Sequence, residues 1–480
     1  MKKDNMFMKK RLMTLGAALM LAWSAWAEGQ AKYVFYFIGD GMGVNQVNGT
    51  ETYLAALEGR IGVKPLQFAQ FPYTGLVTTY SATNGVTDSA AGGTALATGQ
   101  KTKNGVLGML KDQKTRIASI AERAKKSGRA VGVMTSVSVD HATPASFYAH
   151  VPDRDMYYEI GQDLIRASFD FYGGSDFLQP TDKKNPQTPS LYAQSEEAGY
   201  VIARGYEDYE KKKNDAGKMI LLQTEEASKK DRSRIPYAID RKSTDLTLKQ
   251  ITQAGIDFLT TQGDQGFFMM VEGGAIDWAC HANDAAAAFR ETEDLDQAVS
   301  VAYDFYKQHP DETLIVVTAD HETGGLALGV GPYEMHTQVL QNQKMSISDY
   351  SAEVRRLRET LKDKFTWEAV KQSLKENFGF WDQVQLSENQ TKRLKQAYDH
   401  IQKGIAENSK TLYQNDDELA TVAKQILNKV ACVGWQSGGH SNGYVPVFAI
   451  GVGAERFTGR MDNTDIPKKI AEAADYEEIK

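Results

Sequence analysis

Short, continuous runs of apolar residues recur along this 480-residue chain, and each run is rich in Val, Ile or Phe. A continuous run, unlike an alternating one, is typical of a strand that is buried on both faces, as in a parallel sheet covered by helices. The pattern therefore predicts an α/β fold with a mostly parallel central sheet flanked by helices. The runs are residues 33–38, 130–134, 267–271, 314–317 and 446–450.

Polar clusters that contain Gly, Asp, Glu or His follow most of these runs. Ligands of open α/β sheets bind beyond the carboxyl ends of the strands, so clusters in this one position predict a single site. The clusters are residues 39–41, 140–143, 272–274 and 320–321.

The chain changes character between about residues 333 and 430, where Lys, Gln, Glu and Asn dominate. Helical spacing is visible in residues 352–364, 367–377, 388–407 and 417–430, and Ser387 with Gln390 predicts a capping box. We interpret this segment as a helical insertion in one domain of residues 28–480. Two roles remain open for it: it borders the site, or it is a surface appendage with no catalytic part.

The first 27 residues are typical of a secretory signal. Lys9, Lys10 and Arg11 precede an apolar run over residues 12–26, and a small-x-small pattern ends at Ala27. The alternative is an N-terminal membrane anchor, but the run is short compared with the roughly 20 residues of a spanning helix. We therefore expect cleavage after Ala27, a periplasmic or extracellular protein, and no membrane attachment after cleavage.

The net charge argues against a nucleic-acid partner. The whole chain has a formal charge of -7, and loss of residues 1–27, with five basic residues and one acidic, takes it to -11. Nucleic-acid binders usually present a basic face. Any anionic ligand must then be attracted locally, by metals or by a few placed cations.

Half of the eight histidines lie beside Asp, Glu or Gly, which favours metal ligation or catalysis over a surface role. Asp277 and His281 are four residues apart, so a helical turn would place both on one face, a common zinc arrangement. The same spacing also arises by chance in many helices. The four histidines are His141, His281, His321 and His440.

Two further acidic positions have alternative explanations. Asp320 and His321 can converge on one ion only if the backbone turns after the strand; otherwise Asp320 caps the next helix. Asp40 lies in a Gly-rich segment, but the spacing is not G-x-G-x-x-G, and an acid there would repel a pyrophosphate. A metal-bridging carboxylate fits Asp40 better.

Residues 86–95 predict the start of a helix built from small residues. Asp88 or Ser89 can serve simply as its N-cap, which is the more frequent role of such residues. Small neighbours also let an anion and metals approach the backbone, and the helix dipole would polarise a serine at this end.

Taken together, these motifs resemble alkaline phosphatases, in which they occur in the same order. The resemblance covers about residues 32–453 and is weakest through 175–260 and 335–430. The matching segments are residues 39–43, 87–91, 140–145, 272–274, 277–281, 318–321 and 439–440.

The resemblance implies a site with two zinc ions and one magnesium ion, in which Asp40 bridges two metals. One zinc would be held by Asp277, His281 and His440. The second zinc would be held by Asp40, Asp320 and His321. The magnesium would be held by Asp40, Thr143 and Glu272.

The resemblance also implies that Ser89 attacks a phosphate monoester and forms a phosphoserine, which water then hydrolyses. Arg154 would clamp the phosphate, with Asp88 orienting it. The residue types suit this chemistry, because two metals and a guanidinium supply the positive charge that a phosphate dianion requires. We expect small-molecule phosphate monoesters as substrates, activity that rises with pH, and a homodimer as one possible assembly.

Some positions depart from the best-known bacterial pattern. His141 and Trp278 stand where some relatives have Asp and Lys, and both would flank the third metal and the phosphate, so the identity of that metal is left open. Thr323 stands where they have a His. Cys280 can be a zinc ligand in principle, although a small buried filler is favoured, and whether it pairs with Cys432 is also open.

Three alternatives compete with a monoesterase. A phosphodiesterase of the same superfamily shares the two-zinc core, but Arg154 favours monoesters, because a guanidinium suits two free phosphoryl oxygens. A sulfatase lacks support, since no C-x-P-S-R type segment surrounds Ser89. A silent phosphate-binding or zinc-binding protein would be expected to have lost a ligand or the nucleophile, and none is missing.

Overall fold

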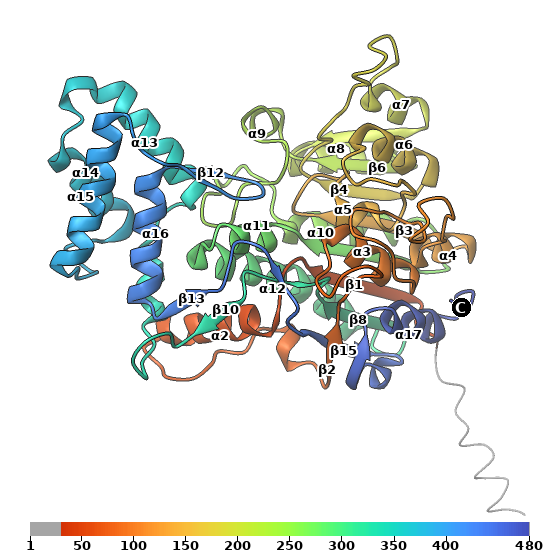
Figure 1. Cartoon of the computed structure of the whole chain (residues 1–480). Coiled ribbons are helices and arrows are strands. Elements are labelled where there is room, and N and C mark those ends of the chain that lie inside the picture. The colour runs from red at the N-terminus through yellow and green to blue at the C-terminus, as the bar shows by residue number, and fades with distance from the viewer. Residues whose placement is uncertain (1–29, 480) are drawn as a thin grey trace, which may run out of the picture.

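A sheet of ten strands forms the centre of the molecule in a computed structural model that describes residues 30–479 (Figure 1). The expected signal at residues 1–27 lies outside the described residues. The strand order is β16-β2-β15-β8-β1-β7-β3-β4-β6-β5. The strands are β1 (Tyr33–Gly39), β2 (Tyr73–Thr78), β3 (Ala130–Thr135), β4 (Phe171–Gly174), β5 (Tyr200–Arg204), β6 (Lys218–Leu222), β7 (Phe267–Gly273), β8 (Thr313–Thr318), β15 (Val445–Gly451) and β16 (Gly459–Asp462).

The sheet is mostly parallel, which confirms the predicted fold class. Strands β8, β1, β7 and β3 lie side by side, run in the same direction and are fully or almost fully buried. Strand β15, which the sequence places among the parallel runs, is antiparallel to both of its neighbours. The reason is local: the chain turns at His440 near the carboxyl ends of the parallel strands, so the strand that begins at Val445 runs back along β8.

Helices cover both faces of the sheet. On one face α10 (Leu248–Leu259) and α12 (Ala285–Gln308) pack against each other and against the central strands. On the other face lie α3 (Ser89–Thr98), α4 (Ile120–Lys126), α5 (Ala142–Ala145) and α17 (Asp465–Ala474). No helix within residues 30–479 is both long enough and apolar enough to cross a bilayer. The remaining helices of the α/β part are α2 (Val44–Leu57), α6 (Tyr157–Ala167), α7 (Leu191–Glu197), α8 (Tyr206–Lys212), α9 (Glu225–Lys230) and α11 (Ala275–His281).

A group of helices with its own hydrophobic core projects from the α/β part (Figure 1). The antiparallel strands β10 (Leu326–Leu328) and β13 (Val433–Trp435) join at its base. The capping box predicted at Ser387 and Gln390 is confirmed. The helices are α13 (Ile347–Leu361), α14 (Trp367–Phe378), α15 (Glu388–Lys403) and α16 (Glu418–Val430).

A short β-hairpin connects α15 to α16 and extends from this helical group toward the α/β part (Figure 1). Its strands are β11 (Ser409–Lys410) and β12 (Asn415–Asp416). The sequence of these residues predicts no regular structure. The hairpin matters because its turn reaches the candidate site.

Candidate metal centre and active site

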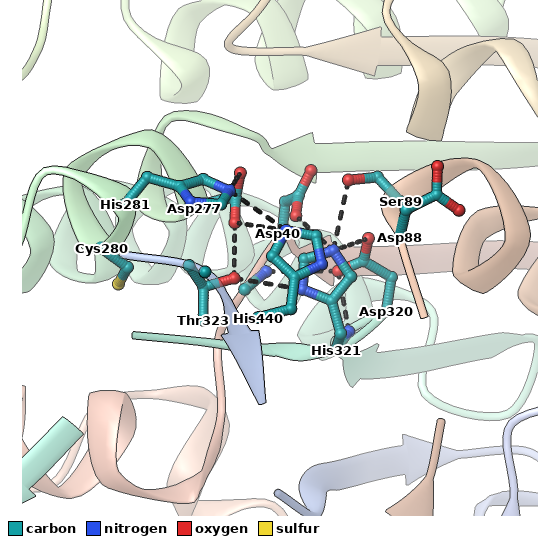
Figure 2. A network of polar contacts seen from close by, with 12 residues as sticks. Asp40, Asp88, Ser89, Asp277, Cys280, His281, Asp320, His321, Thr323 and His440 are labelled. Atoms are coloured by element: carbon teal, nitrogen blue, oxygen red, sulfur yellow. Dashed lines mark hydrogen bonds and ion pairs between the residues drawn. The ribbon is translucent and has the colours of Figure 1, made fainter. Parts of the chain in front are cut away.

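Acidic residues and histidines converge at the carboxyl ends of three adjacent strands (Figure 2). Strand β1 lies between β7 and β8 and ends next to Asp40, while β7 contains Glu272 and β8 is followed by Asp320. Ile38 pairs with Glu272 on one side and with Thr318 on the other, so the three carboxylates lie at the same level of the sheet. Gly41, at a φ of +71°, lets the chain turn here without a side chain that would meet Thr323 and Asp277.

One group of candidate ligands consists of Asp277, His281 and His440. Asp277 and His281 lie one turn apart on α11, and His281 Nε2 is 3.3 Å from Asp277 Oδ2. His440 comes from the opposite end of the chain, and the pairing of β14 (His440–Ser441) with β9 (Glu322–Thr323) brings it to the site. Its Nε2 lies 3.6 Å from Asp277 Oδ1.

The hydrogen bonds of these two histidines fix which ring nitrogen is free. His281 Nδ1 lies 2.6 Å from the carbonyl oxygen of Gly438, and His440 Nδ1 lies 2.8 Å from that of Thr87. A carbonyl oxygen only accepts, so both Nδ1 atoms carry hydrogen and, in the neutral rings, both Nε2 atoms carry lone pairs. These Nε2 atoms lie 3.1 Å apart. Two lone pairs that face each other beside a carboxylate are an arrangement that a bound cation satisfies.

A second group consists of Asp40, Asp320 and His321, all of them buried. Thr323 Oγ1 lies 2.5 Å from Asp277 Oδ1 and 3.2 Å from His321 Nδ1. Because the hydroxyl has one proton and donates it to the carboxylate, it accepts from His321 Nδ1–H. His321 Nε2 is then free to face Asp320 Oδ2 at 3.1 Å and Asp40 Oδ1 at 3.4 Å.

A third group shares Asp40 and adds Glu272 and His141. Thr143 Oγ1 donates to Asp40 Oδ2 at 3.3 Å, which places this hydroxyl beside the bridging carboxylate. The hydroxyl of Thr135, at the end of β3, donates to Glu272. The family resemblance placed His141 beside the third metal and the phosphate, without a ligand role. The structure brings an imidazole nitrogen of His141 within 4.8 Å of carboxylate oxygens of Asp40 and Glu272.

The buried carboxylates lie too close to one another, and have too few cationic neighbours among the described residues, for all of them to be ionised without bound cations. Burial raises the pKa of Asp40 well above its usual range, and the neighbouring acids, led by Asp320, raise it further. Burial also raises the pKa of Glu272 to about 8. Several of their buried oxygens accept no hydrogen bond from residues 30–479, as expected for atoms that coordinate cations. These oxygens are Asp40 Oδ1, Glu272 Oε1, Asp277 Oδ2 and Asp320 Oδ2.

Ser89 begins helix α3, and its Oγ lies 3.2 Å from His321 Nε2. Asp88 is the N-cap of this helix and accepts a hydrogen bond from the backbone of Ala91 at 3.0 Å. The small residues of α3 have a direct use: a Cβ on Gly92 would lie 2.9 Å from the carbonyl oxygen of Asp320. Glycine therefore lets the first turn of α3 lie against the metal-ligand loop.

Arg154 provides the cationic side chain next to Ser89. Its Nη1 donates to Asp88 Oδ2 at 3.1 Å, and its Nη2 lies 3.4 Å from His141 Nε2. Burial would lower the pKa of Arg154, but Tyr413 and Asp88 raise it, so the guanidinium stays charged. Burial and Arg154 together lower the pKa of His141 to about 3, so this imidazole is neutral.

Tyr413, in the hairpin turn, is a site residue that the sequence analysis missed. Its ring stacks on Trp278 at 4.3 Å between centroids and lies edge-on to His281 at 5.4 Å. No local pattern around residue 413 points to this contact. Thr135 was also missed, although its place at the end of a predicted strand was a usable signal.

The two cysteines are both buried and free, so they form no disulfide. The Sγ of Cys280 lies 3.9 Å from Gln46 Nε2 and belongs to none of the three ligand groups in residues 30–479. The structure thus agrees with Cys280 as a small buried filler.

Comparison with known proteins gives consistent matches. The family model described as "Alkaline phosphatase" matches residues 31–169 and 193–476. Alkaline phosphatase 3 of Bacillus subtilis is 33% identical over 452 residues, which are 93% of this chain and 90% of that protein. The cold-active alkaline phosphatase of a psychrophilic Shewanella is 28% identical with a TM-score of 0.75, over 92% of this chain and 99% of that one.

Another solved relative contains a bound magnesium ion. It is a mutant of the TAB5 alkaline phosphatase in which a histidine is replaced by aspartate, with Mg bound in its M3 site. The two chains are 25% identical with a TM-score of 0.64, over 94% of this chain and 99% of that one.

Proposed function

Because this chain belongs to the alkaline phosphatase family and hydrolyses phosphate monoesters, we propose that it does so through a phosphoserine on Ser89. The observation that carries the proposal is the position of Ser89 Oγ, 3.2 Å from the free Nε2 of His321 and beside the Asp88–Arg154 pair. A hydroxyl placed between a metal-ligand group and a guanidinium is poised to attack a bound phosphoryl group.

The residues at the site fit two zinc ions and one magnesium ion. The groups Asp277, His281, His440 and Asp40, Asp320, His321 suit zinc, because imidazole nitrogens and carboxylates are its usual ligands. The carboxylates of Asp40 and Glu272 with the Thr143 hydroxyl suit magnesium, and His141 lies beside this group. The bound cations would neutralise phosphoryl charge and lower the pKa values of the attacking and leaving oxygens. The lone pairs on His281 and His440, and the carboxylate oxygens that accept no hydrogen bond, support this assignment.

Each protein group has a defined part in the reaction. The fork of Arg154 binds two phosphoryl oxygens of the monoester, and Asp88 holds the guanidinium in place. Ser89 Oγ loses its proton to solvent and attacks phosphorus, and the bond from phosphorus to the alcohol oxygen breaks. The departing oxygen takes up a proton from solvent and leaves as the alcohol. Water then attacks the phosphoserine, releasing inorganic phosphate and restoring the Ser89 hydroxyl.

The direct test is to look for the phosphoserine. Brief incubation of the metal-loaded enzyme with an aryl phosphate, followed by acid quenching and mass spectrometry, should show one added phosphate on the peptide that contains Ser89. Ser89→Ala should lose both the label and at least about 10³-fold in kcat. Ser195→Ala is a matched control. Ser195 is also buried, is distant from Ser89 in the sequence, and donates a hydrogen bond only to the carbonyl of Leu191. A label that persists in Ser89→Ala would overturn the assignment.

Preference for monoesters is tested with an aryl phosphate and its matching diester at pH 7 to 10, before and after chelation and return of zinc and magnesium. We expect chelator-sensitive activity that rises with pH and a strong preference for the monoester, because Arg154 needs two free phosphoryl oxygens. Preference for the diester would instead support a phosphodiesterase.

We also propose that the chain is exported and cleaved after Ala27, on the basis of the basic and apolar pattern of residues 1–27. Cell fractionation with N-terminal sequencing should find the mature protein outside the cytoplasm, beginning at Glu28. An intact N-terminus in the membrane fraction would support an anchor.

A further inference from the structure

A cleft of about 810 Å³ opens between the α/β part and the helical group, directly beside the candidate metal centre. From the α/β side it is lined by His281, Asn283 and Gly438, whose carbonyl accepts the hydrogen bond from His281 Nδ1. From the helical group it is lined by the hairpin and by α16. The volume lies in the range of small-molecule pockets.

The lining of the cleft is basic, whereas the whole chain has a formal net charge of -7. The lining contains Lys410, Lys424 and Lys429 and no Asp or Glu. Lys424 is buried, its Nζ donates to the carbonyl of Ala282, and Asp416 lies near it, so its charge is already engaged. Lys410 and Lys429 are exposed and form no ion pair with a carboxylate of residues 30–479.

The position of the cleft relative to Ser89 indicates which part of a substrate would enter it. In an in-line displacement the leaving oxygen lies opposite the attacking oxygen. Ser89 contacts His321, while His281 lies at the other end of the ligand group (Figure 2). The cleft begins at His281 and therefore lies on the side from which the alcohol departs.

The hairpin lies beside both the metal centre and the cleft. Tyr413 is held against Trp278 and His281, and Leu412 and Lys410, which precede it, line the cleft. Leu412 is 64% exposed, a large apolar side chain available to contact a ligand. The hairpin thus connects the metal centre to the lysine side chains that line the cleft.

We propose that this cleft binds the alcohol part of the substrate and that Lys410 and Lys429 favour phosphate monoesters whose alcohol carries a second anionic group. The proposal rests on the monoesterase function proposed above, and it adds a preference at the leaving-group side of the same site. The second anion can be a carboxylate or another phosphate, because two ammonium groups attract either.

The test uses two substrates of nearly equal size, 3-carboxyphenyl phosphate and 3-carbamoylphenyl phosphate, which differ by one negative charge. Wild-type enzyme should show a higher kcat/KM for the carboxylate. The double variant Lys410→Gln/Lys429→Gln should lower the ratio of the two kcat/KM values by roughly three- to tenfold, the effect of two exposed charge pairs. The kcat/KM for the carbamoyl substrate should stay the same.

Lys392→Gln/Lys403→Gln is the matched control, since both residues are exposed on α15, outside the cleft, and the change in net charge is equal. The control should keep the wild-type ratio. An unchanged ratio in the cleft variant, or an equal loss in the control, would overturn the proposal, and the second result would indicate general attraction by surface charge. If the metal-loaded wild type hydrolyses neither substrate, the proposed function itself fails.

Discussion

Arg154 and Asp88 form a partly buried ion pair, with Nη1 3.1 Å from Oδ2, at the point where helix α3 begins. The same Asp88 oxygen also accepts a hydrogen bond from the backbone of Gly105 at 3.0 Å, and the other oxygen caps the helix through Ala91. One carboxylate therefore sets the position of both the proposed nucleophile, Ser89, and the proposed phosphate clamp.

Asp88→Asn separates these two tasks. Asparagine caps a helix about as well as aspartate, so Ser89 should keep its place, while Arg154 loses its charged partner. We expect KM and the inhibition constant of inorganic phosphate to rise about tenfold, with a smaller change in kcat. Steady-state kinetics with phosphate as inhibitor measures this, and equal phosphate inhibition in variant and wild type would contradict it.

Thr323→Val should weaken metal retention. The Thr323 hydroxyl links Asp277 of one ligand group to His321 of the other, and valine has a similar shape without the hydroxyl. Loss of such a supporting hydrogen bond typically costs about 10- to 100-fold in metal affinity. Metal content after dialysis against graded chelator measures the change. Thr98→Val removes two hydrogen bonds at the end of α3, one to the carbonyl of Thr94 and one from the backbone of Gln100, and should retain metal like wild type.

His150→Gln should destabilise the protein at mildly acidic pH and much less at alkaline pH. Burial lowers the pKa of His150, but Glu122, 3.1 Å away, and the carbonyl of Gly108 outweigh burial and raise it. A histidine whose pKa is raised in the folded state stabilises the fold fully at pH values below its pKa in the unfolded chain, which is about 6.5. This stabilisation is lost as the pH rises through the pKa of the folded state.

We expect a loss of about 1 kcal/mol in the free energy of unfolding at pH 6. Denaturant titrations of both proteins at pH 6 and pH 9, at the same metal concentration, give the difference directly. A loss in the free energy of unfolding that is larger at pH 9 than at pH 6 would contradict the expected direction of the pH dependence.

Removing metals should cost more stability at pH 9 than at pH 5. Without cations, burial raises the pKa of Glu272 to about 8 in the folded protein. A raised carboxyl pKa means that the folded state binds more protons, so stability falls as pH rises from about 4.5 to 8. Scanning calorimetry with chelator or with excess metal should show a gap in unfolding temperature that widens across this range. A gap that stays constant would contradict it.

The central strands were predictable from the sequence because they are buried on both faces. Strands β1, β3, β7 and β8 read as continuous apolar runs for this reason. Strand β2 was missed, since alternate residues of it are exposed and Gly75 interrupts it. The direction of β15 was also not predictable, because it depends on the turn at His440 and not on the residues of the strand.

The candidate ligands were predictable because each lies in a short motif next to a strand or helix end. Tyr413 was not, since its contact with Trp278 joins the helical group to the α/β part and leaves no local pattern. The close approach of His141 to Asp40 and Glu272 likewise depends on how β3 and β7 align. Contacts between distant segments are decided by packing, which one sequence does not display.

The alignment of β1 between β7 and β8 has a consequence for how the protein acquires its metals. Within any short stretch of the unfolded chain there are at most two of the proposed zinc ligands, as in Asp277 with His281 or Asp320 with His321, and Asp40 and His440 lie near opposite ends. Ions bound to such fragments would be held weakly. The sheet must therefore assemble before the ions are captured, and the metals available where the chain completes its folding would decide which ions the enzyme carries.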